Sequence, residues 1–211
     1  MRNPTLPGAD GPANLLAAVQ VAASDEARNL GALVVFNDEI HAASLVRKTH
    51  TQSPATFSSV PLGPIGYVAE NAVQIVLRPA RRRRVDLDSL AGDQRVALLT
   101  ASMGDDGSLV GAVRDAGYAG LVVEALGGGH VPSPWIEPLT ALADEVPVIL
   151  ASRTGGGEVL RRTYGFAGSE MDLIERGLIP AGPLDGHKAR LFLTLLLRSG
   201  AAGQVIATAF G

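Results

Sequence analysis

Apolar runs alternate with segments of helical periodicity from residue 95 onward, and this alternation constrains the fold more than any other feature of the chain. A strand, a helix and a second strand at this spacing form a βαβ unit, and successive units build a parallel sheet. The expected strands are Arg95–Ala101, Gly120–Glu124 and Val146–Ala151, and the expected helices are Ser108–Asp115, Ser133–Asp144, Ser169–Arg176 and Gly186–Arg198. The aromatic content of 4% fits this prediction, because buried parallel strands are built mainly from aliphatic residues.

Residues 1–78 show a different pattern, with one long helix followed by short strands. Asp10 is suited to capping that helix and Pro12 is tolerated in its first turn, and we expect the helix to run to about Asn29. The expected strands are Ala32–Phe36, Gly66–Glu70 and Val73–Leu77, the last two joined as a hairpin. These elements are too few to complete a doubly wound sheet, so residues 1–78 are predicted to form the incomplete remainder of one.

The composition changes between these two regions. A run of four arginines, Arg81–Arg84, is followed directly by acidic residues and has no periodicity, which favours a solvated linker over residues 79–94. The predicted fold class is therefore α/β. It combines an incomplete N-terminal doubly wound sheet over residues 1–78 with a smaller C-terminal parallel β/α (flavodoxin-like) domain over residues 95–211.

Charge and composition exclude several functional classes. The net charge of -3 provides no general attraction for nucleic acid. The chain has no cysteine, which removes thiolate nucleophiles and cysteine metal sites, and its four histidines show no ligand spacing. No complete Walker or dinucleotide-binding glycine motif is present. We therefore expect no metal, no cofactor and no nucleic-acid partner.

The hydropathy pattern gives no sign of membrane insertion or export. No apolar stretch of the sequence is long enough to span a bilayer, and the first residues lack the apolar core of a signal peptide. These observations predict a cytoplasmic protein without membrane contact. A segment upstream of residue 1 would allow a periplasmic or secreted location instead.

Several motifs occur in a characteristic order along the chain. In the first half these are Met1-Arg2-Asn3-Pro4, Ala9 to Leu15 (ADGPANL), Val35-Phe36-Asn37-Asp38, Val46 to Thr51 (VRKTHT) and Phe57 to Gly66 (FSSVPLGPIG). In the second half they are Gly117 to Val123 (GYAGLVV), Gly127 to His130, Ala181-Gly182 and Lys188-Ala189-Arg190. No single motif is specific, but in this order and spacing they resemble the bacterial L-asparaginase/glutaminase family over essentially all 211 residues.

The resemblance implies a particular chemistry. Members of this family hydrolyse the side-chain amide of asparagine to aspartate and ammonia, through a threonine nucleophile and a covalent acyl intermediate. A threonine hydroxyl needs a positioned base, and in the family one such base is a lysine partnered by an aspartate and a second threonine. The matching residue is Lys48, which the resemblance implies to be catalytic. Taken alone, a lysine in a polar loop is more often a solvated charge.

The sequence also departs from the family at the nucleophile. The family carries it in a Thr-Gly-Gly-Thr segment and its partners in a Thr-Asp-Thr segment, and both precede the motif that matches Met1. The one Thr-Gly-Gly here, Thr154-Gly155-Gly156, follows a strand of the second domain, and we interpret it as a glycine-rich loop. We therefore expect an N-terminally truncated chain, whether a fragment, a misassigned start or half of a split enzyme, that is inactive alone.

Two residues of the second domain match family positions that bind the substrate across a subunit interface. His130 follows Gly127–Gly129, where an asparagine is often found, and it retains the ability to donate a hydrogen bond to a carboxylate. Glu170 matches an acidic residue that receives the substrate's amino group. Each has a structural alternative: His130 as a surface-loop residue, and Glu170 as a favourable charge in the capping box Ser169-x-x-Asp172.

The leading hypothesis is an L-asparaginase-type amidohydrolase acting on L-asparagine or L-glutamine, and the resemblance implies a homotetramer built as a dimer of dimers. The expected partners are the small-molecule substrate and either further copies of the chain or a complementing N-terminal segment. The alternative is a non-catalytic ligand-binding or assembly domain that retains the scaffold. A third hypothesis, the asparaginase-like subunit of a tRNA amidotransferase, requires nucleic-acid-facing regions that are not evident in the sequence.

Overall fold

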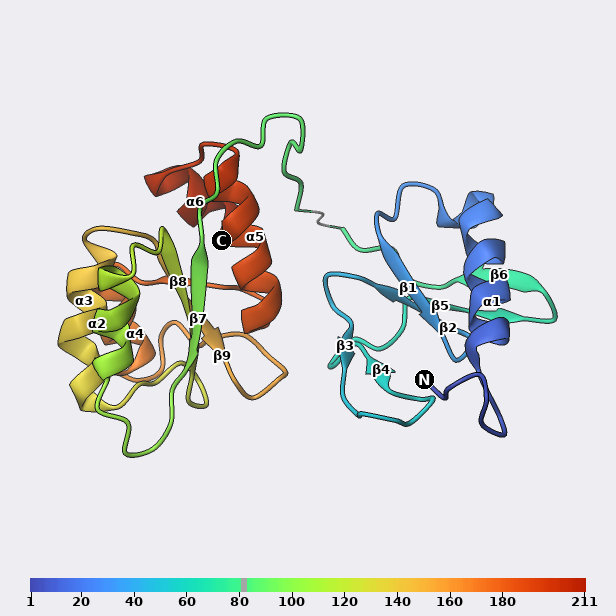
Figure 1. Cartoon of the computed structure of the whole chain (residues 1–211), viewed down its shortest axis with the longest axis horizontal. Coiled ribbons are helices and arrows are strands. Elements are labelled where there is room, and N and C mark those ends of the chain that lie inside the picture. Colours follow the sequence, from blue (N-terminus) through green and yellow to red (C-terminus); the bar gives the residue numbers. More distant parts are fainter. Residues whose placement is uncertain (81–82) are drawn as a thin grey trace. The chain divides into compact units, whose positions relative to one another are not determined.

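A computed structural model describes residues 1–80 and 83–211 (Figure 1). The chain divides into two compact units, Met1–Arg82 and Arg83–Gly211, called unit 1 and unit 2 below. The division falls inside the segment 79–94 that the sequence predicts to be a linker. Arg81 and Arg82, two members of the predicted arginine run, lie outside the described residues.

Unit 1 is built on an antiparallel sheet in the order β1-β2-β5-β6, with helix α1 packed against it. Its elements are α1 (Gly11–Ala23), a 3₁₀ turn (Asp25–Ala27), β1 (Leu33–Phe36), β2 (Glu39–Ala42), β3 (Arg47–Lys48), β4 (Phe57–Ser58), β5 (Gly66–Ala69) and β6 (Ala72–Ile75). Strands β3 and β4 form a separate two-stranded sheet. The core of unit 1 contains the fully buried Ile40 together with Val21 and Ile65.

Two tight turns set the antiparallel pairing of β1 with β2 and of β5 with β6. Asn37 and Asp38 join β1 to β2, and Glu70 and Asn71 join β5 to β6, all four with positive φ. Two consecutive residues of positive φ give the turn that matches the twist of a hairpin. The α/β class and the hairpin over Gly66–Ile75 are confirmed, whereas the described strands of unit 1 contain none of the parallel pairs of a doubly wound sheet.

Helix α1 differs from the prediction at both ends. It ends at Ala23 rather than near Asn29, because Ser24 is extended and its hydroxyl accepts the N–H of Glu26, which starts the 3₁₀ turn. Asp10 occupies the N-cap position but does not cap the helix with its side chain. Its carboxylate instead accepts hydrogen bonds from the backbone N–H of Arg2 at 2.8 Å and the side-chain amide of Asn14 at 3.2 Å.

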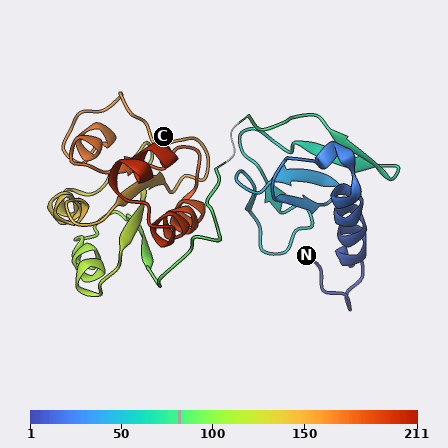
Figure 2. The same ribbon diagram turned by 90° about the horizontal axis from the view of Figure 1, so that it is seen from above.

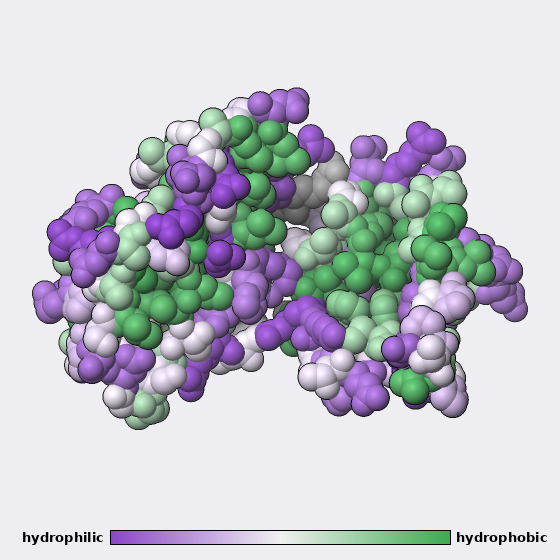
Figure 3. All heavy atoms as spheres, in the orientation of Figure 1, coloured by the Kyte–Doolittle hydropathy of each residue, from purple (hydrophilic) through white to green (hydrophobic). Residues whose placement is uncertain are grey.

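A row of apolar side chains on α1 is open to solvent. Leu15, Leu16 and Val19 are each more than half exposed, and the helix carries no charged residue. Figure 3 shows apolar side chains gathered on the face of unit 1 that it draws. Exposed apolar patches of this kind are typical of surfaces that another chain segment or subunit covers.

Unit 2 contains the predicted parallel sheet, in the order β10-β9-β8-β7. Its elements are β7 (Val96–Thr100), α2 (Ser108–Asp115), β8 (Gly120–Ala125), a 3₁₀ turn (Ser133–Trp135), α3 (Ile136–Ala143), β9 (Val148–Ser152), α4 (Glu170–Glu175), β10 (Ile179–Pro180), α5 (Gly186–Arg198) and α6 (Gly203–Phe210). The strands β7, β8 and β9 lie where the sequence predicts them. Strand β10 was not predicted, because its two residues are too few to show a period.

Helices cover both faces of this sheet. Leu121 and Val123 of β8 belong to a cluster with residues of α2, α3 and α4, while Val122, between them, belongs to a cluster with residues of α5 and α6. Successive side chains of a strand point to opposite faces, so β8 must be apolar on both faces along its buried part, from Leu121 to Val123. Figures 1 and 2 show α2, α3 and α4 on one side of the sheet and α5 and α6 on the other.

Helix α5 offers a matched test of this packing. Leu193 is fully buried in the cluster between α5 and the sheet, whereas Leu191 on the same helix is 61% exposed. We expect Leu193→Ala to lower the free energy of unfolding of unit 2 by about 2 to 5 kcal/mol, because it removes buried methyl groups and leaves a cavity. Leu191→Ala should change it by no more than about 0.5 kcal/mol.

The measurement is urea-induced unfolding followed by the fluorescence of Trp135, the only tryptophan of the chain and 1% exposed within unit 2. Equal effects of the two substitutions would contradict the packing of α5 on the sheet.

Candidate functional site

Lys48 lies in unit 1, at the end of strand β3. The pairs Arg47–Ser58 and Lys48–Phe57 join β3 to β4, and the side chain of Lys48 is exposed. The loop between the strands is held by Thr56, which is fully buried: its carbonyl accepts the N–H of Thr49 at 2.8 Å, and its hydroxyl accepts the N–H of His50 at 3.0 Å. The backbone next to Lys48 is therefore fixed, although the amine forms no ion pair with any described residue.

A buried polar contact ties this hairpin to the main sheet of unit 1. The ring nitrogen Nδ1 of His41, on β2, lies 2.9 Å from the hydroxyl of Ser59, and both residues are 1% exposed. Nε2 of His41 is 3.2 Å from a carboxylate oxygen of Glu39. The rings of Phe36 and Phe57 are also in contact, with centroids 4.9 Å apart. Sequence analysis did not single out His41 or Ser59, because their pairing joins segments with no shared motif.

In unit 2 the structure brings His130 and Glu170 together. Strand β8 leads into the turn Gly127–Gly129, and His130 closes this turn by pairing with Leu126. Gly129 has a φ of 122°, and a Cβ on it would lie 2.6 Å from Val159 and 3.2 Å from Cβ of Glu170. Only glycine fits here. The glycine run thus allows the turn to pack directly against the start of α4, where Glu170 is the first residue.

Glu170 is a fully buried carboxylate. Its Oε1 accepts hydrogen bonds from the backbone N–H groups of Thr163 at 3.0 Å and Tyr164 at 2.8 Å, and its Oε2 lies 3.3 Å from Nε2 of His130. Burial raises the pKa of Glu170. The two N–H groups and the charge of His130 lower it by a larger amount, so the net pKa lies below its ordinary value. Glu170 is therefore ionised at neutral pH.

Two aromatic rings fix the orientation of His130. Tyr164 and Phe166 each have their ring centroid 5.0 Å from that of His130, in edge-to-face geometry. Such contacts favour one ring plane. His130 itself is 24% exposed, whereas Glu170 has no exposed surface. Because Glu170 is buried, it is better placed to orient the ring of His130 than to contact a substrate directly.

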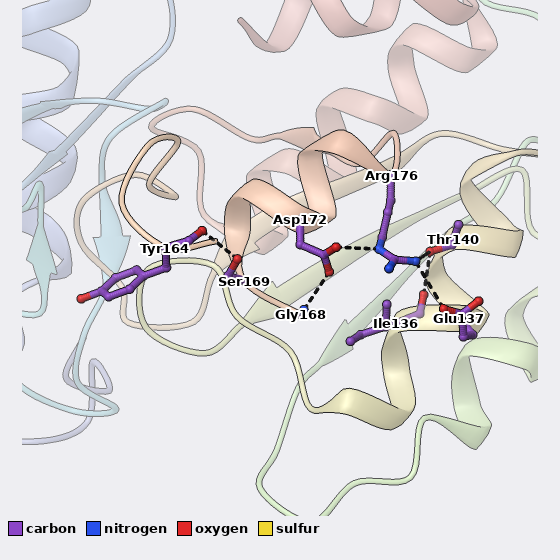
Figure 4. Close-up of polar contacts among 8 residues, drawn as sticks. All are labelled: Ile136, Glu137, Thr140, Tyr164, Gly168, Ser169, Asp172 and Arg176. Atoms are coloured by element: carbon purple, nitrogen blue, oxygen red, sulfur yellow. Dashed lines mark hydrogen bonds and ion pairs between the residues drawn. The ribbon is translucent and has the colours of Figure 1, made fainter. Parts of the chain in front are cut away.

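The start of α4 is held by Asp172 rather than by the predicted capping box (Figure 4). Ser169 is the N-cap residue, but its hydroxyl donates to the carbonyl of Tyr164 at 2.7 Å instead of capping the helix. Asp172 accepts the N–H of Gly168 at 2.8 Å and the Nε–H of Arg176 at 2.9 Å. Arg176 also reaches Glu137 and Thr140 of α3, both at 3.3 Å, so it connects α4 to α3.

The segment after β9 has the predicted character of a glycine-rich loop. The hydroxyl of Thr154 donates to the carbonyl of Gly156 at 3.0 Å and lies 2.9 Å from the hydroxyl of Ser152. Ser152 in turn donates to the carbonyl of Gly127 at 2.6 Å. These contacts give Thr154 a structural role in joining the loops that follow β8 and β9.

Within residues 1–80 and 83–211, no group of three or more His, Cys, Asp or Glu side chains is placed to hold a metal ion. In the same described residues, no helix has both the length and the apolar character to cross a membrane.

Two family models match the chain in order. The model "Asparaginase, N-terminal" matches residues 1–81, and "Glutaminase/Asparaginase C-terminal domain" matches residues 95–210. Individual proteins are also similar. The chain is 42% identical over 209 residues to "Probable L-asparaginase" of Deinococcus radiodurans, a match that covers 95% of this chain and 62% of that protein.

Two further relatives carry different names. The chain is 33% identical over 202 residues to L-asparaginase 2 of Escherichia coli (strain K12), covering 93% of this chain and 56% of that protein. It is 30% identical over 204 residues to a glutamyl-tRNA(Gln) amidotransferase component of Methanobrevibacter smithii, covering 93% and 46%. The chain thus spans less than two thirds of the length of each of these relatives.

The contacts of Asp172 predict a pH-dependent contribution to stability. Its pKa is lowered below the ordinary value of 3.8, because the N–H of Gly168 and the cation of Arg176 outweigh the opposing effect of burial. A carboxylate whose pKa is depressed by folding stabilises the folded state above its ordinary pKa, and this stabilisation is lost as the pH falls through the folded-state pKa. We expect Asp172→Asn to lower the free energy of unfolding at pH 7 by about 1 to 3 kcal/mol.

The difference from the unmodified chain should shrink as the pH falls through the folded-state pKa of Asp172, where the carboxyl becomes protonated in both states. Urea unfolding at a series of pH values, followed by Trp135 fluorescence, measures it. Glu137→Gln is the matched control, because Glu137 contacts the same arginine but is 84% exposed and should contribute at most about 1 kcal/mol. A deficit in Asp172→Asn that stays constant across this pH range would refute the assignment.

Proposed function

Because the chain belongs to the glutaminase/asparaginase family, we propose that it forms the greater part of an L-asparaginase-type amidohydrolase. The reaction is hydrolysis of the side-chain amide of L-asparagine to L-aspartate and ammonia, with L-glutamine as the second candidate substrate. The observation that carries this proposal is the collinear match of both domain models, over residues 1–81 and 95–210. Relatives named as L-asparaginases support the same chemistry.

Lys48 is assigned the role of proton acceptor for the nucleophile. It stands in the motif that resembles the family, and its backbone is held by β4 and by the buried Thr56. Its amine is exposed and has no ion-pair partner among the described residues, so it is free to face a reacting hydroxyl. A base must lie within hydrogen-bond reach of the proton that it accepts.

The nucleophile is assigned to a threonine outside the 211 residues. The only Thr-Gly-Gly segment, at Thr154, is engaged in loop contacts of unit 2. The chain spans 62% and 56% of two L-asparaginase relatives, which leaves room in those proteins for the missing segment. The proposed enzyme therefore needs that segment, either joined to this chain or as a separate one.

Substrate recognition is assigned to the loop that carries His130. This ring is partly exposed and fixed in orientation, and a histidine can donate a hydrogen bond to a carboxylate. In the proposed assembly, a homotetramer built as a dimer of dimers, His130 would reach the substrate bound in a neighbouring copy. Glu170 contacts Nε2 of this ring from the buried side and helps to orient it.

The rival proposal is a non-catalytic ligand-binding or assembly domain on the same scaffold. One relative of this chain is named as an amidotransferase subunit and not as an L-asparaginase, so the scaffold is not confined to proteins of that name. The exposed apolar residues of α1 give the two proposals different expectations. A domain that functions alone should remain monodisperse despite these residues, whereas a part of a larger enzyme should need a partner to cover them.

Complementation tests the proposed function directly. The chain is mixed with an N-terminal segment from an L-asparaginase of the family, and ammonia release from L-asparagine is measured. We expect no release from the chain alone and release from the mixture. Lys48→Met should reduce the restored rate by at least about 100-fold, since general acid–base catalysis typically contributes a factor of 10² to 10⁴.

The chain has only one other lysine, Lys188, which pairs with Asp185 at 2.6 Å at the start of α5. Lys188→Met is therefore the control, and its restored rate should stay close to that of the unmodified chain. Full activity of Lys48→Met would show that Lys48 is not the base. Vigorous hydrolysis by the chain without the added segment would show that it contains its own nucleophile. A monodisperse chain that melts cooperatively and stays inactive in the mixture would favour the rival proposal.

A further inference from the structure

The contact between Glu170 and His130 leaves two buried atoms facing each other. Oε2 of Glu170 and Nε2 of His130 are 3.3 Å apart, and neither atom has a hydrogen-bond partner among the described residues. An ionised carboxylate can only accept hydrogen bonds, whereas an imidazole nitrogen can donate or accept according to where its proton is. A buried acceptor left without a donor destabilises the fold. Of the two atoms, only Nε2 can offer a donor to the other, and it can do so only when it carries a proton.

The other carboxylate oxygen cannot change places with Oε2. Oε1 accepts two backbone N–H groups, those of Thr163 and Tyr164. These donors belong to the backbone and cannot become acceptors, so they fix which side of Glu170 faces the ring. The edge contacts of Tyr164 and Phe166 also hold the ring plane of His130. Both partners are thus held in place by groups that do not depend on a ligand.

We propose that Glu170 is a positioning residue that keeps the proton of His130 on Nε2, so that Nδ1 is the ring atom presented to a ligand. No described residue forms a hydrogen bond with Nδ1. When the ring is protonated, Nδ1–H donates to an anionic group such as the carboxylate of an amino acid. The identity of that ligand rests on the proposed function, whereas the position of the proton does not.

Replacing the carboxylate with an amide gives a sharp test. In Glu170→Gln the side-chain oxygen must stay on the N–H groups of Thr163 and Tyr164, because an amide NH₂ there would oppose two donors. The NH₂ group then faces Nε2 of His130. A donor at this position requires an unprotonated Nε2, so the proton of the neutral ring must move to Nδ1. A carboxylate-to-amide change is known to impose the wrong tautomer on a histidine in this way.

The experiment is a long-range ¹H–¹⁵N NMR spectrum of the histidine rings in the whole 211-residue chain, with the signals of His130 assigned from a His130→Gln variant. It is recorded at about pH 9, above the ordinary imidazole pKa of about 6.5. We expect the Nε2–H tautomer to dominate in the unmodified chain and the Nδ1–H tautomer to dominate in Glu170→Gln. Retention of the Nε2–H tautomer in a folded Glu170→Gln chain overturns the proposal.

Asp172→Asn is the control for a purely structural effect. Asp172 is also on α4, and its loss weakens the contacts with Gly168 and Arg176 without touching His130. This variant should be less stable but keep the Nε2–H tautomer, and a change of tautomer here would also overturn the proposal. If Glu170→Gln does not fold, the unmodified chain still decides: a dominant Nδ1–H tautomer contradicts the role of Glu170, and an Nε2–H proton that exchanges slowly with water supports it.

These outcomes are independent of catalysis. A tautomer that inverts as expected, together with no ammonia release on complementation, would leave the role of Glu170 intact and reject the proposed function. Restored ammonia release with an unchanged tautomer in Glu170→Gln would support the proposed function and reject the role of Glu170.

Discussion

Burial of the parallel sheet on both faces is the constraint on which unit 2 depends. Neighbouring residues of β8, such as Leu121 and Val122, belong to different apolar clusters, so each strand must be aliphatic on both sides and helices must cover both faces. Parallel strands also place all their carboxyl ends along one edge, where the loops that follow them gather. The turn ending at His130 follows β8, and the loop of Thr154 follows β9. The hydroxyl of Ser152 bonds these two loops together. The geometry of the candidate site in unit 2 is therefore a consequence of the sheet.

The same constraint explains what the sequence could predict. Long aliphatic runs bounded by turn residues identify β7, β8 and β9, because a strand buried on both faces leaves a strong signal. Strand β10 leaves almost none, since two residues cannot show a period. In unit 1 the feature that was not predicted is the hairpin of β1 and β2. The pairs Asn37-Asp38 and Glu70-Asn71 adopt positive φ and make tight hairpins, but only the second pair lies in a hairpin that was predicted. Helix α1 ends early because Ser24 starts a 3₁₀ turn, a local competition that helical periodicity does not reveal.

The resemblance to the family identified the candidate site residues, but only the structure shows which of them are in contact. His130 and Glu170 come from separate motifs, and nothing in either motif indicates that a carboxylate oxygen would lie 3.3 Å from a ring nitrogen. That proximity depends on Gly129, where a Cβ would collide with Val159 and crowd Glu170. The capping-box pattern around Ser169 was misleading for a related reason. Asp172 has the right spacing for a capping box, but the backbone of Gly168 has a φ of 84° and presents its N–H to the carboxylate instead.

The two units differ in how far their charged groups are satisfied internally. Glu170 is buried and ionised, and a buried charge persists only if donors are supplied; here the backbone of Thr163 and Tyr164 supplies them from within unit 2. Its geometry is thus organised before any ligand arrives. Lys48 is the opposite case, an exposed amine on a hairpin whose backbone is fixed by Thr56 and His41 but whose side chain pairs with no described residue. A rigid backbone that carries a solvated amine cannot by itself make that amine a base. If Lys48 acts as proposed, the groups that activate it must be brought by another segment or by a further copy of the chain, and the exposed apolar residues of α1 show that unit 1 has surface available for such a partner.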